Sequence, residues 1–513
     1  MLEHVHIISS PLDKVPAIHL NHISLQIPLQ NSLSAAPILR LPPDILVAVF
    51  AISDDLTHDE SYLKRVISAR KPFPFIASHV CAEWRCVAIT NPLLWTRLHV
   101  VPPWSYELVD LWHTRSRQCL IDFHLTAVDK LLYRSQSDGQ SDDWDRTCHR
   151  ALLGLARFYE RAVAPHITKY RSISIHTGDS DQLANIGWFF LKKFREFPDT
   201  VPALRALTLQ IHDTISDDEG SEGVLFPRGA PALIQVLMGS PFSIPRGTCL
   251  GLTRLHINLQ HLFSKRLHET LSESPALQTL VLYNHFQYDA SPNFDDLPPL
   301  QLASLSSIQL YGAGTLSSFQ LLQFFSSGLH APELRHILVA PVNGGQLAKF
   351  LSSGGFQSQS FPALEAVTIG LNESEGRKEE EHILMLHRCF PDVVQATLVG
   401  RGLRRGLGAL KRTGEDGLLV WPKLRTLGLR GCHLGHFKKG EVRGLAASRA
   451  KAGAPLNKVV LDQKSLGCMT GEDMMWLREH VEMEEDDEWQ RLRWAAGVHD
   501  VEMPKSIVDL DRD

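Results

Sequence analysis

The sequence predicts an α/β solenoid, with parallel strands on one face and helices on the other, preceded by a small helical unit. Ten copies of the pattern apolar-x-x-apolar-x-apolar run through the last two-thirds of the 513 residues. From the copy at Leu252 to the copy at Leu456, successive copies lie 25 to 32 residues apart. A fixed period of about 20 to 50 residues is typical of solenoids. The copies begin at Tyr170, Leu204, Leu252, Leu277, Leu305, Leu334, Leu364, Val393, Leu424 and Leu456.

Each copy is short and rich in leucine or β-branched residues, which favours a strand. In the clear copies, such as PALRALTL at 202–209 and PKLRTLGL at 422–429, a proline stands two residues ahead of the first leucine. Because proline cannot donate a ladder hydrogen bond, we expect it at the strand entrance. Strand followed by helix, repeated, gives parallel strands in register with helices behind them. The helices are expected at 260–272, 317–329, 345–352 and 378–390.

One interval in the array is much longer than the others. The copies at Leu204 and Leu252 are 48 residues apart, and the chain between them carries an acidic insert at 215–223 and an expected helix at 231–239. We interpret this interval as one enlarged unit. The solenoid is predicted over 166–465, and residues 466–513 are expected to form a C-terminal helical cap and an acidic tail.

Positions between the core leucines face outward from the sheet and are candidates for binding a partner. Tyrosine and arginine are favoured anchors at protein interfaces. The substrate-binding candidates are therefore His256, Asn258, Tyr283, Tyr311 and Arg430. Other outward positions are Thr208, Gln210, Val281, Gln309, Leu338, Thr368 and Thr397. The alternative is that outward positions on any sheet are simply polar.

Residues 38–100 have the pattern of three short helices. Pro42, Pro43 and Asp44 are typical of a helix start, because proline presets φ and an acid meets the positive end of the helix dipole. Apolar residues at helical spacing then define the first helix (Ile45, Leu46, Val49, Phe50) and the second (Ile76, Val80, Trp84, Val87). Residues 91–95 read as a cap, a first-turn proline and a short third helix.

The flanks of this unit are less regular. Residues 1–37 are expected to form a partly disordered leader with a short extended segment at 23–29. Residues 101–165 are expected to form a helical link that contains one strand, at 120–125, and a helix at 151–163.

The segment 38–100 resembles the F-box. The resemblance lies in residues 41–46 (LPPDIL) with Val49 and Phe50, in a middle group (Val80, Cys81, Trp84, Arg85, Ala88) and in a closing group (Asn91, Pro92, Leu93, Leu94, Trp95, Leu98). The segment between Phe50 and Phe73 is longer than the short connection of a minimal F-box. The whole chain looks like F-box proteins of mushroom-forming fungi, in which degenerate leucine-rich repeats follow the F-box.

This resemblance implies a two-ended adaptor. The F-box would dock onto the S-phase-kinase-associated adaptor subunit of an SCF-type cullin–RING ubiquitin ligase, and the leucine-rich-repeat-like solenoid would hold a protein substrate. The residues themselves agree with docking, because three short helices cannot bury all the apolar side chains they carry. The expected docking residues are Leu41, Pro42, Pro43, Ile45, Leu46, Val49, Phe50, Val80, Trp84 and Trp95. The alternative is that these residues pack against the link or the solenoid, in a scaffold protein outside any ligase.

Composition argues against several other classes of function. The chain has 52 Lys and Arg against 57 Asp and Glu, a net charge of −5, which is too near neutral for a nucleic-acid or membrane surface. The eight cysteines are scattered without a CxxC pair, so we expect reduced thiols and a cytoplasmic or nuclear protein. We see no secretory signal, and the longest apolar run, 45–52, is far shorter than the roughly 20 residues of a membrane span.

Catalytic and metal-binding motifs are weak. Gly178-Asp-Ser180 resembles the nucleophile motif of lipase-like hydrolases, but the DxxH strings that could supply its base lie upstream, at 55–58 and 110–113. Cys432, His433 and His436 lack the second pair of ligands that a structural zinc site needs. No P-loop occurs, and no GxGxxG follows a strand. We therefore expect no enzyme activity, metal or cofactor, with a serine hydrolase around Ser180 as the weak alternative.

Overall fold

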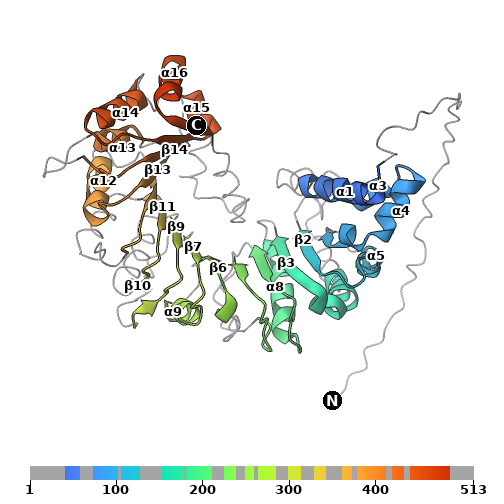
Figure 1. Ribbon diagram of the computed structural model, residues 1–513. Helices are drawn as coiled ribbons and strands as arrows, with labels where there is room; N and C mark the ends of the chain where they lie inside the picture. The colour runs from blue at the N-terminus through green and yellow to red at the C-terminus, as the bar shows by residue number, and fades with distance from the viewer. Residues whose placement is uncertain are drawn as a thin grey trace, which may run out of the picture.

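The chain forms an arc in which strands line the inner side and helices cover the outer side (Figure 1). The structure, a computed structural model, describes residues 41–57, 73–101, 105–127, 153–177, 181–210, 225–238, 249–258, 264–284, 298–312, 329–342, 361–371, 378–400, 403–411, 419–431 and 440–485. The mixed α/β architecture predicted from the repeat is confirmed. None of the helices in these ranges is long and apolar enough to cross a membrane.

One 14-stranded, fully parallel sheet runs through the arc, and its strands follow one another in sequence order. The strands are β1 Arg97–Val100, β2 Ile121–Ala127, β3 Tyr170–Thr177, β4 Ala206–Gln210, β5 Gln235–Met238, β6 Arg254–Asn258, β7 Thr279–Asn284, β9 Ser307–Gly312, β11 His336–Val342, β12 Ala366–Leu371, β13 Gln395–Gly400, β14 Thr426–Arg430, β15 Lys458–Leu461 and β16 Glu482–Glu485. The short strands β8 (Leu300–Gln301) and β10 (Leu329–His330) form a separate pair. The sheet therefore extends beyond the predicted 166–465 at both ends.

Many of the repeats begin with a β-turn, and in the clear copies the proline occupies its second position. The N–H of the first leucine donates to the carbonyl three residues earlier, as in Leu277 to Ser274 (3.1 Å) and Leu424 to Trp421 (2.9 Å). Proline suits the second position of such a turn because its φ is preset near −65°. In the turn that closes at Leu204, Pro202 is exposed and the strand starts only at Ala206. The proline therefore shapes the turn ahead of the strand rather than the strand entrance itself.

A shared main-chain carbonyl joins each repeat to the next. The carbonyl of Arg205 accepts the N–H groups of both Ile234 (2.9 Å) and Gln235 (3.0 Å). The same double acceptance recurs along the sheet at the carbonyls of Ile234, Thr253, Gln278, Ser306, Arg335, Glu365, Val394 and Arg425. Because these bonds lie just before each strand, they set the register of the strand pair that follows.

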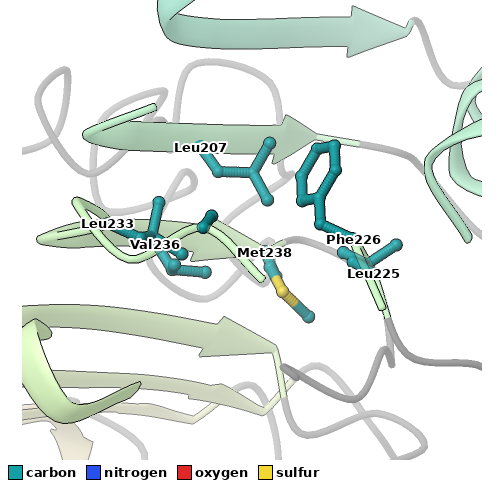
Figure 2. A pocket seen from close by; sticks show the side chains of 7 residues that line it. Leu207, Leu225, Phe226, Leu233, Val236 and Met238 are labelled. Carbon is teal, nitrogen blue, oxygen red and sulfur yellow. The ribbon is translucent and has the colours of Figure 1, made fainter. Parts of the chain in front are cut away.

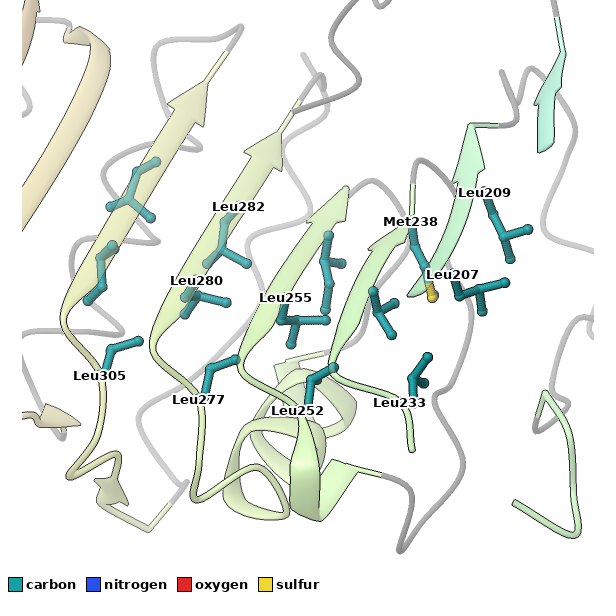
Figure 3. Packing of buried hydrophobic residues seen from close by; sticks show 14 of the residues in the cluster. Leu207, Leu209, Leu233, Met238, Leu252, Leu255, Leu277, Leu280, Leu282 and Leu305 are labelled. Carbon is teal, nitrogen blue, oxygen red and sulfur yellow. The ribbon is translucent and has the colours of Figure 1, made fainter. Parts of the chain in front are cut away.

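The leucines of the pattern stack in columns behind the sheet. Figure 3 shows Leu252, Leu277 and Leu305 in one such column, one residue from each repeat. All three are fully buried, as are Leu255 and Leu280 on the strands beside them. Burying one leucine contributes about 1.5 to 3 kcal/mol, so the columns are the main source of stability in the arc.

The segment between Leu204 and Leu252 differs from the prediction. The helix expected at 231–239 is absent: residues 231–232 form a turn and Gln235–Met238 form strand β5. Residues 231–238, PALIQVLM, carry a further copy of the repeat, with Leu233, Val236 and Met238 buried. The long interval is therefore two units, because the apolar spacing of a strand repeat outweighed the short helical pattern. The acidic insert at 215–223 lies outside the described residues.

Helices cover the outer face where the chain is described. They are α5 Tyr106–Ser116, α8 Asp181–Glu196, α9 Ser264–Ser272, α12 Lys378–Cys389, α13 Leu403–Leu410, α14 Glu441–Lys451, α15 Gln463–Gly467 and α16 Gly471–His480, with shorter turns η4 Tyr159–Val163, η5 Ala164–Lys169 and η7 Cys249–Gly251. The helices expected at 260–272 and 378–390 correspond to α9 and α12. The helix expected at 345–352, most of that at 317–329 and the leader at 1–37 lie outside the described residues.

A buried arginine holds one of the turns in place. Arg449 of α14 is fully buried, and its two terminal nitrogens donate to the carbonyls of Val420 (2.9 Å) and Trp421 (2.7 Å). Trp421 has a φ of 48°, in the left-handed region that non-glycine residues rarely adopt. Its indole N–H donates to the carbonyl of Phe390 (2.9 Å). Burial lowers the pKa of Arg449 to about 10, so the guanidinium stays charged at neutral pH.

We predict that Arg449→Met lowers the free energy of unfolding by about 2 to 4 kcal/mol, because the Val420 carbonyl loses its side-chain donor and the Trp421 carbonyl loses one of its two donors. Urea unfolding followed by circular dichroism measures this loss. The matched control is Arg443→Met on the same helix, where the side chain is exposed and the expected change is below about 0.5 kcal/mol. Equal losses in the two variants would contradict a structural role for the buried guanidinium.

Candidate functional site

Three helices and a 3-10 turn pack into a small unit at the N-terminal end of the described chain: α1 Pro43–Thr57, α3 Phe73–Ser78, α4 Ala82–Thr90 and η2 Pro92–Trp95. Leu46 and Phe50 of α1 are fully buried at its centre. The Phe50 ring lies 4.8 Å from the Trp84 ring and 5.5 Å from the Phe73 ring, both in edge-on geometry. These contacts fix α1 against α3 and α4.

Local hydrogen bonds determine where the helices start. The Cys81 sulfur caps α4 by accepting from the N–H of Trp84 (3.4 Å). The Asn91 side-chain oxygen caps η2 by accepting from the N–H of Leu93 (3.1 Å), as the Asn-Pro sequence predicts. Arg85 Nε donates to the carbonyl of Ser78 (2.8 Å) and ties α4 to the end of α3.

The unit exposes an unusual share of apolar side chains. Of the twelve large hydrophobic residues that are exposed among the described residues, six belong to this unit. We call these six residues the exposed apolar set: Ile45, Ile52, Ile76, Val80, Ile89 and Leu93. The most exposed, Leu93, keeps 64% of its accessible surface. A high share of exposed apolar side chains in one small unit favours an interaction site.

The residues predicted to dock divide into three groups. Ile45 and Val80 are in the exposed apolar set, and Pro42 and Pro43 are also exposed. Leu41, Val49 and Trp84 are partly buried against the core. Leu46, Phe50 and Trp95 are fully buried and support the face from inside, in contrast to the expectation that they form it. Sequence spacing identified the apolar residues, but which of them lie inside depends on how the helices pack.

An aromatic joint fixes this unit to the sheet. The Trp95 indole N–H donates to the Ala88 carbonyl (2.7 Å), and the Trp112 indole N–H of α5 donates to the Arg97 carbonyl (2.9 Å). The two indole rings are 4.8 Å apart, and the Arg115 guanidinium lies 4.3 Å from the centre of the Trp95 ring. Only Thr96 separates η2 from β1, so the exposed apolar set is held in a defined position relative to the first strand.

Seven of the predicted outward positions lie in one continuous row on the inner face of the sheet, together with Leu237 and Gly428. Register places Thr208, Leu237, His256, Val281, Gln309, Leu338, Thr368, Thr397 and Gly428 side by side on successive strands. Most of this row is buried: His256 is 9% exposed, Val281 1% and Thr397 4%. On the concave side of an arc, side chains from neighbouring strands converge and cover one another.

This burial corrects the prediction for His256, which is not open to a partner in this structure. Tyr311 and Arg430 are partly buried on the same face, and the side chains of Asn258 and Tyr283 lie outside the described part. Gly428 shows how tight the row is, since a side-chain carbon there would lie 2.5 Å from the Thr397 hydroxyl oxygen. Glycine therefore lets the β13 and β14 side chains share the inner face.

Polar groups on the inner face are satisfied largely by one another. His336 Nε2 lies 3.1 Å from the Thr368 hydroxyl, and its Nδ1 lies 3.4 Å from the Ser307 hydroxyl. The Tyr311 hydroxyl donates to the Gln309 side-chain oxygen (3.2 Å). Burial and the positive charge of Arg430 together lower the pKa of His336 to about 4. These contacts stabilise a polar layer at the centre of the arc.

Two further histidines are buried in the neutral form. Burial and the neighbouring Arg254 lower the pKa of His256 to about 4, and its Nδ1 has no hydrogen-bond partner. His113 of α5 lies 3.1 Å from the Tyr170 hydroxyl and stacks on the His166 ring at 3.7 Å. Burial and the charges of His166 and Lys169 lower the pKa of His113 to about 3.

A small internal void lies between β4 and β5 (Figure 2). It encloses about 10 Å³ and is lined by apolar side chains, Leu207, Leu225, Phe226, Ala230, Leu233, Val236 and Met238. That volume is at the lower limit for one water molecule, and an apolar lining leaves such a void dry. It is a packing imperfection rather than a ligand site.

The structure does not describe the two segments that resemble a catalytic motif and a metal-binding motif. Ser180, and the segment from Cys432 to His436, lie outside the described residues. Within the described ranges, no three His, Cys, Asp or Glu side chains are positioned to hold a metal ion. Neither a protein-family model nor a curated protein sequence matches the chain. The features that the described chain offers are therefore an exposed apolar set, a buried polar inner face and the arc that connects them.

We predict that the chain becomes less stable as pH falls from about 7 to about 4. Unfolded histidines take up a proton near pH 6.5, whereas folded His113, His256 and His336 resist protonation until about pH 3 to 4. Lowering the pH from 7.5 to 5.5 therefore reduces the free energy of unfolding by about 1 kcal/mol for each of these three histidines. Urea unfolding at pH 7.5 and 5.5 measures the difference.

The His256→Gln and His336→Gln double variant should lose part of this pH dependence. The matched control is His330→Gln, an exposed histidine on β10, which should leave the pH dependence unchanged. A double variant with the full pH dependence of the wild-type chain would show that these two imidazoles are not responsible.

Proposed function

We propose that the chain is the substrate-recognition adaptor of an SCF-type cullin–RING ubiquitin ligase. In this proposal the helical unit docks onto the S-phase-kinase-associated adaptor subunit, and the arc binds a protein substrate that other subunits modify. The observation that carries the proposal is the concentration of the exposed apolar set in one small unit. Apolar side chains at the centre of a surface patch are the usual basis of protein–protein association.

The resemblance of residues 38–100 to the F-box suggests the partner. Among the residues that carry it, Pro42, Pro43, Ile45, Val80 and Leu93 are exposed, and Leu46, Phe50 and Trp95 form the core. That division supports docking, because a binding unit needs both a stable interior and an apolar exterior. The aromatic joint supports it as well, since an adaptor must present its substrate in a defined position relative to the ligase.

A scaffold outside any ligase, in which the helical unit only caps the first strand, is the rival interpretation. The contact between Trp95 and Trp112 fits either role. A unit that serves only as a cap, however, needs apolar residues only where it meets the sheet. The exposed apolar set therefore favours the adaptor. The cytoplasm or the nucleus is the proposed compartment, in agreement with free cysteines such as Cys81 and Cys86.

We predict that Val80→Asp with Leu93→Asp abolishes co-purification with the S-phase-kinase-associated subunit, because both changes place a charge in a desolvated interface. Each lost apolar contact alone weakens association by roughly tenfold or more. Affinity by surface plasmon resonance, with the purified subunit as analyte, measures the loss. Both residues are exposed, so the fold should be retained; Leu46 is unsuitable for this test because it is buried.

The matched control is Ile234→Asp with Leu250→Asp, which adds the same charges at exposed apolar positions of the arc. This control should bind the subunit as the wild-type chain does. Failure of the wild-type chain to bind, or equal binding by the Val80 and Leu93 variant, would overturn the adaptor proposal and favour the scaffold.

A further inference from the structure

The last strand of the sheet, β16, has an edge that no other described strand pairs with. On one side it pairs in parallel with β15, with Lys458 beside Glu482 and Leu461 beside Glu485. The Glu482 N–H donates to the Asn457 carbonyl (2.9 Å), so the amides of Glu482 and Glu484 point toward β15. Because amides alternate along a strand, those of Met483 and Glu485 point to the other side.

The outer edge of β16 carries a main-chain acceptor in the same position as the acceptors that precede strands β4 to β15. An acceptor carbonyl stands one residue before its strand: the Arg425 carbonyl before β14 accepts two N–H groups, and the Asn457 carbonyl before β15 accepts the Glu482 N–H. Val481 occupies this position before β16. Among the described residues, no N–H from a following strand reaches the Val481 carbonyl. The register-setting acceptor of a further strand is thus already in place.

The side chains of β16 would select what pairs there. Glu482 and Glu484 lie on the inner face, and their side chains are 69% and 48% exposed. Lys458 on β15 shows that these glutamates pair with a basic side chain on the neighbouring strand, since its Nζ lies 3.4 Å from Glu482 Oε1 and also pairs with Glu484. On the opposite face Met483 is partly buried against the core. An added strand would therefore meet acids on one face and an apolar contact on the other.

A second copy of this edge is a poor occupant. Two β16 strands side by side would bring glutamates next to one another, and like charges on neighbouring strands are destabilising. Charged residues on an edge strand also suppress indiscriminate pairing. An extended segment with basic residues at alternate positions has neither problem, because its basic side chains face Glu482 and Glu484.

We propose that the edge of β16 binds an extended basic segment of a partner protein as an additional parallel strand, with Lys or Arg beside Glu482 and Glu484. Main-chain bonds to Val481, Met483 and Glu485 provide attachment, and the two carboxylates provide selectivity. The proposal does not depend on the adaptor function, since it concerns the opposite end of the arc.

The test uses the full-length chain and a fluorescein-labelled peptide of three Lys-Val repeats, with a peptide of three Glu-Val repeats as the probe of opposite charge. Fluorescence polarisation should show saturable binding of the Lys-Val peptide only. Glu482→Gln with Glu484→Gln should weaken binding by about three- to tenfold. Glu472→Gln with Glu479→Gln on α16 removes the same charge at exposed positions off the strand and should leave binding unchanged.

Hydrogen exchange distinguishes edge pairing from simple charge attraction. Amide exchange of the segment that contains Met483 and Glu485 should slow several-fold when the Lys-Val peptide binds. Met483→Pro removes an outward amide without removing a bond to β15, and it should abolish this binding. No binding of the Lys-Val peptide, binding without added protection, or equal weakening by the α16 control variant would overturn the proposal.

Discussion

A single main-chain oxygen, shared by two N–H groups of the next repeat, is the interaction on which this fold depends. It recurs from Arg205 to Arg425 and sits immediately ahead of each strand. Since it fixes where each strand begins relative to its neighbour, it also fixes which side chains stand side by side. The leucine columns on one face and the row from Thr208 to Gly428 on the other both follow from that register.

The same register explains why the inner face is less open than a repeat pattern suggests. Side chains from successive strands converge on the concave side, so His256, Thr368 and Thr397 are buried. Polar groups there bond to neighbours on adjacent strands, as His336 does to the Thr368 hydroxyl. Gly428 is the clearest consequence, because the Thr397 hydroxyl occupies the space that a side chain would need. Among the described residues, the two features proposed for recognition lie at the two ends of the arc.

Those ends differ in physical character. At one end an apolar set is held by the joint between Trp95 and Trp112, and at the other an acidic strand ends the ladder. Apolar contact favours a stable partner, whereas main-chain pairing beside Glu482 and Glu484 favours an extended segment of basic charge. The parallel sheet between them holds the two ends at a fixed distance and orientation. The arc thus separates two unlike surfaces by a fixed structure.

The sequence by itself determined the local features: turns that proline starts, leucines that point inward and a helical unit capped at Asn91. These features depend on neighbours within one repeat. The copy of the repeat that contains Leu233 is likewise visible in the sequence. Only the tertiary structure decided the rest. Burial of His256 and Leu46, exposure of Leu93 and the position of β16 at an edge each depend on residues far away in the chain. Spacing shows which residues are apolar or polar, whereas packing determines which of them water and partners can reach.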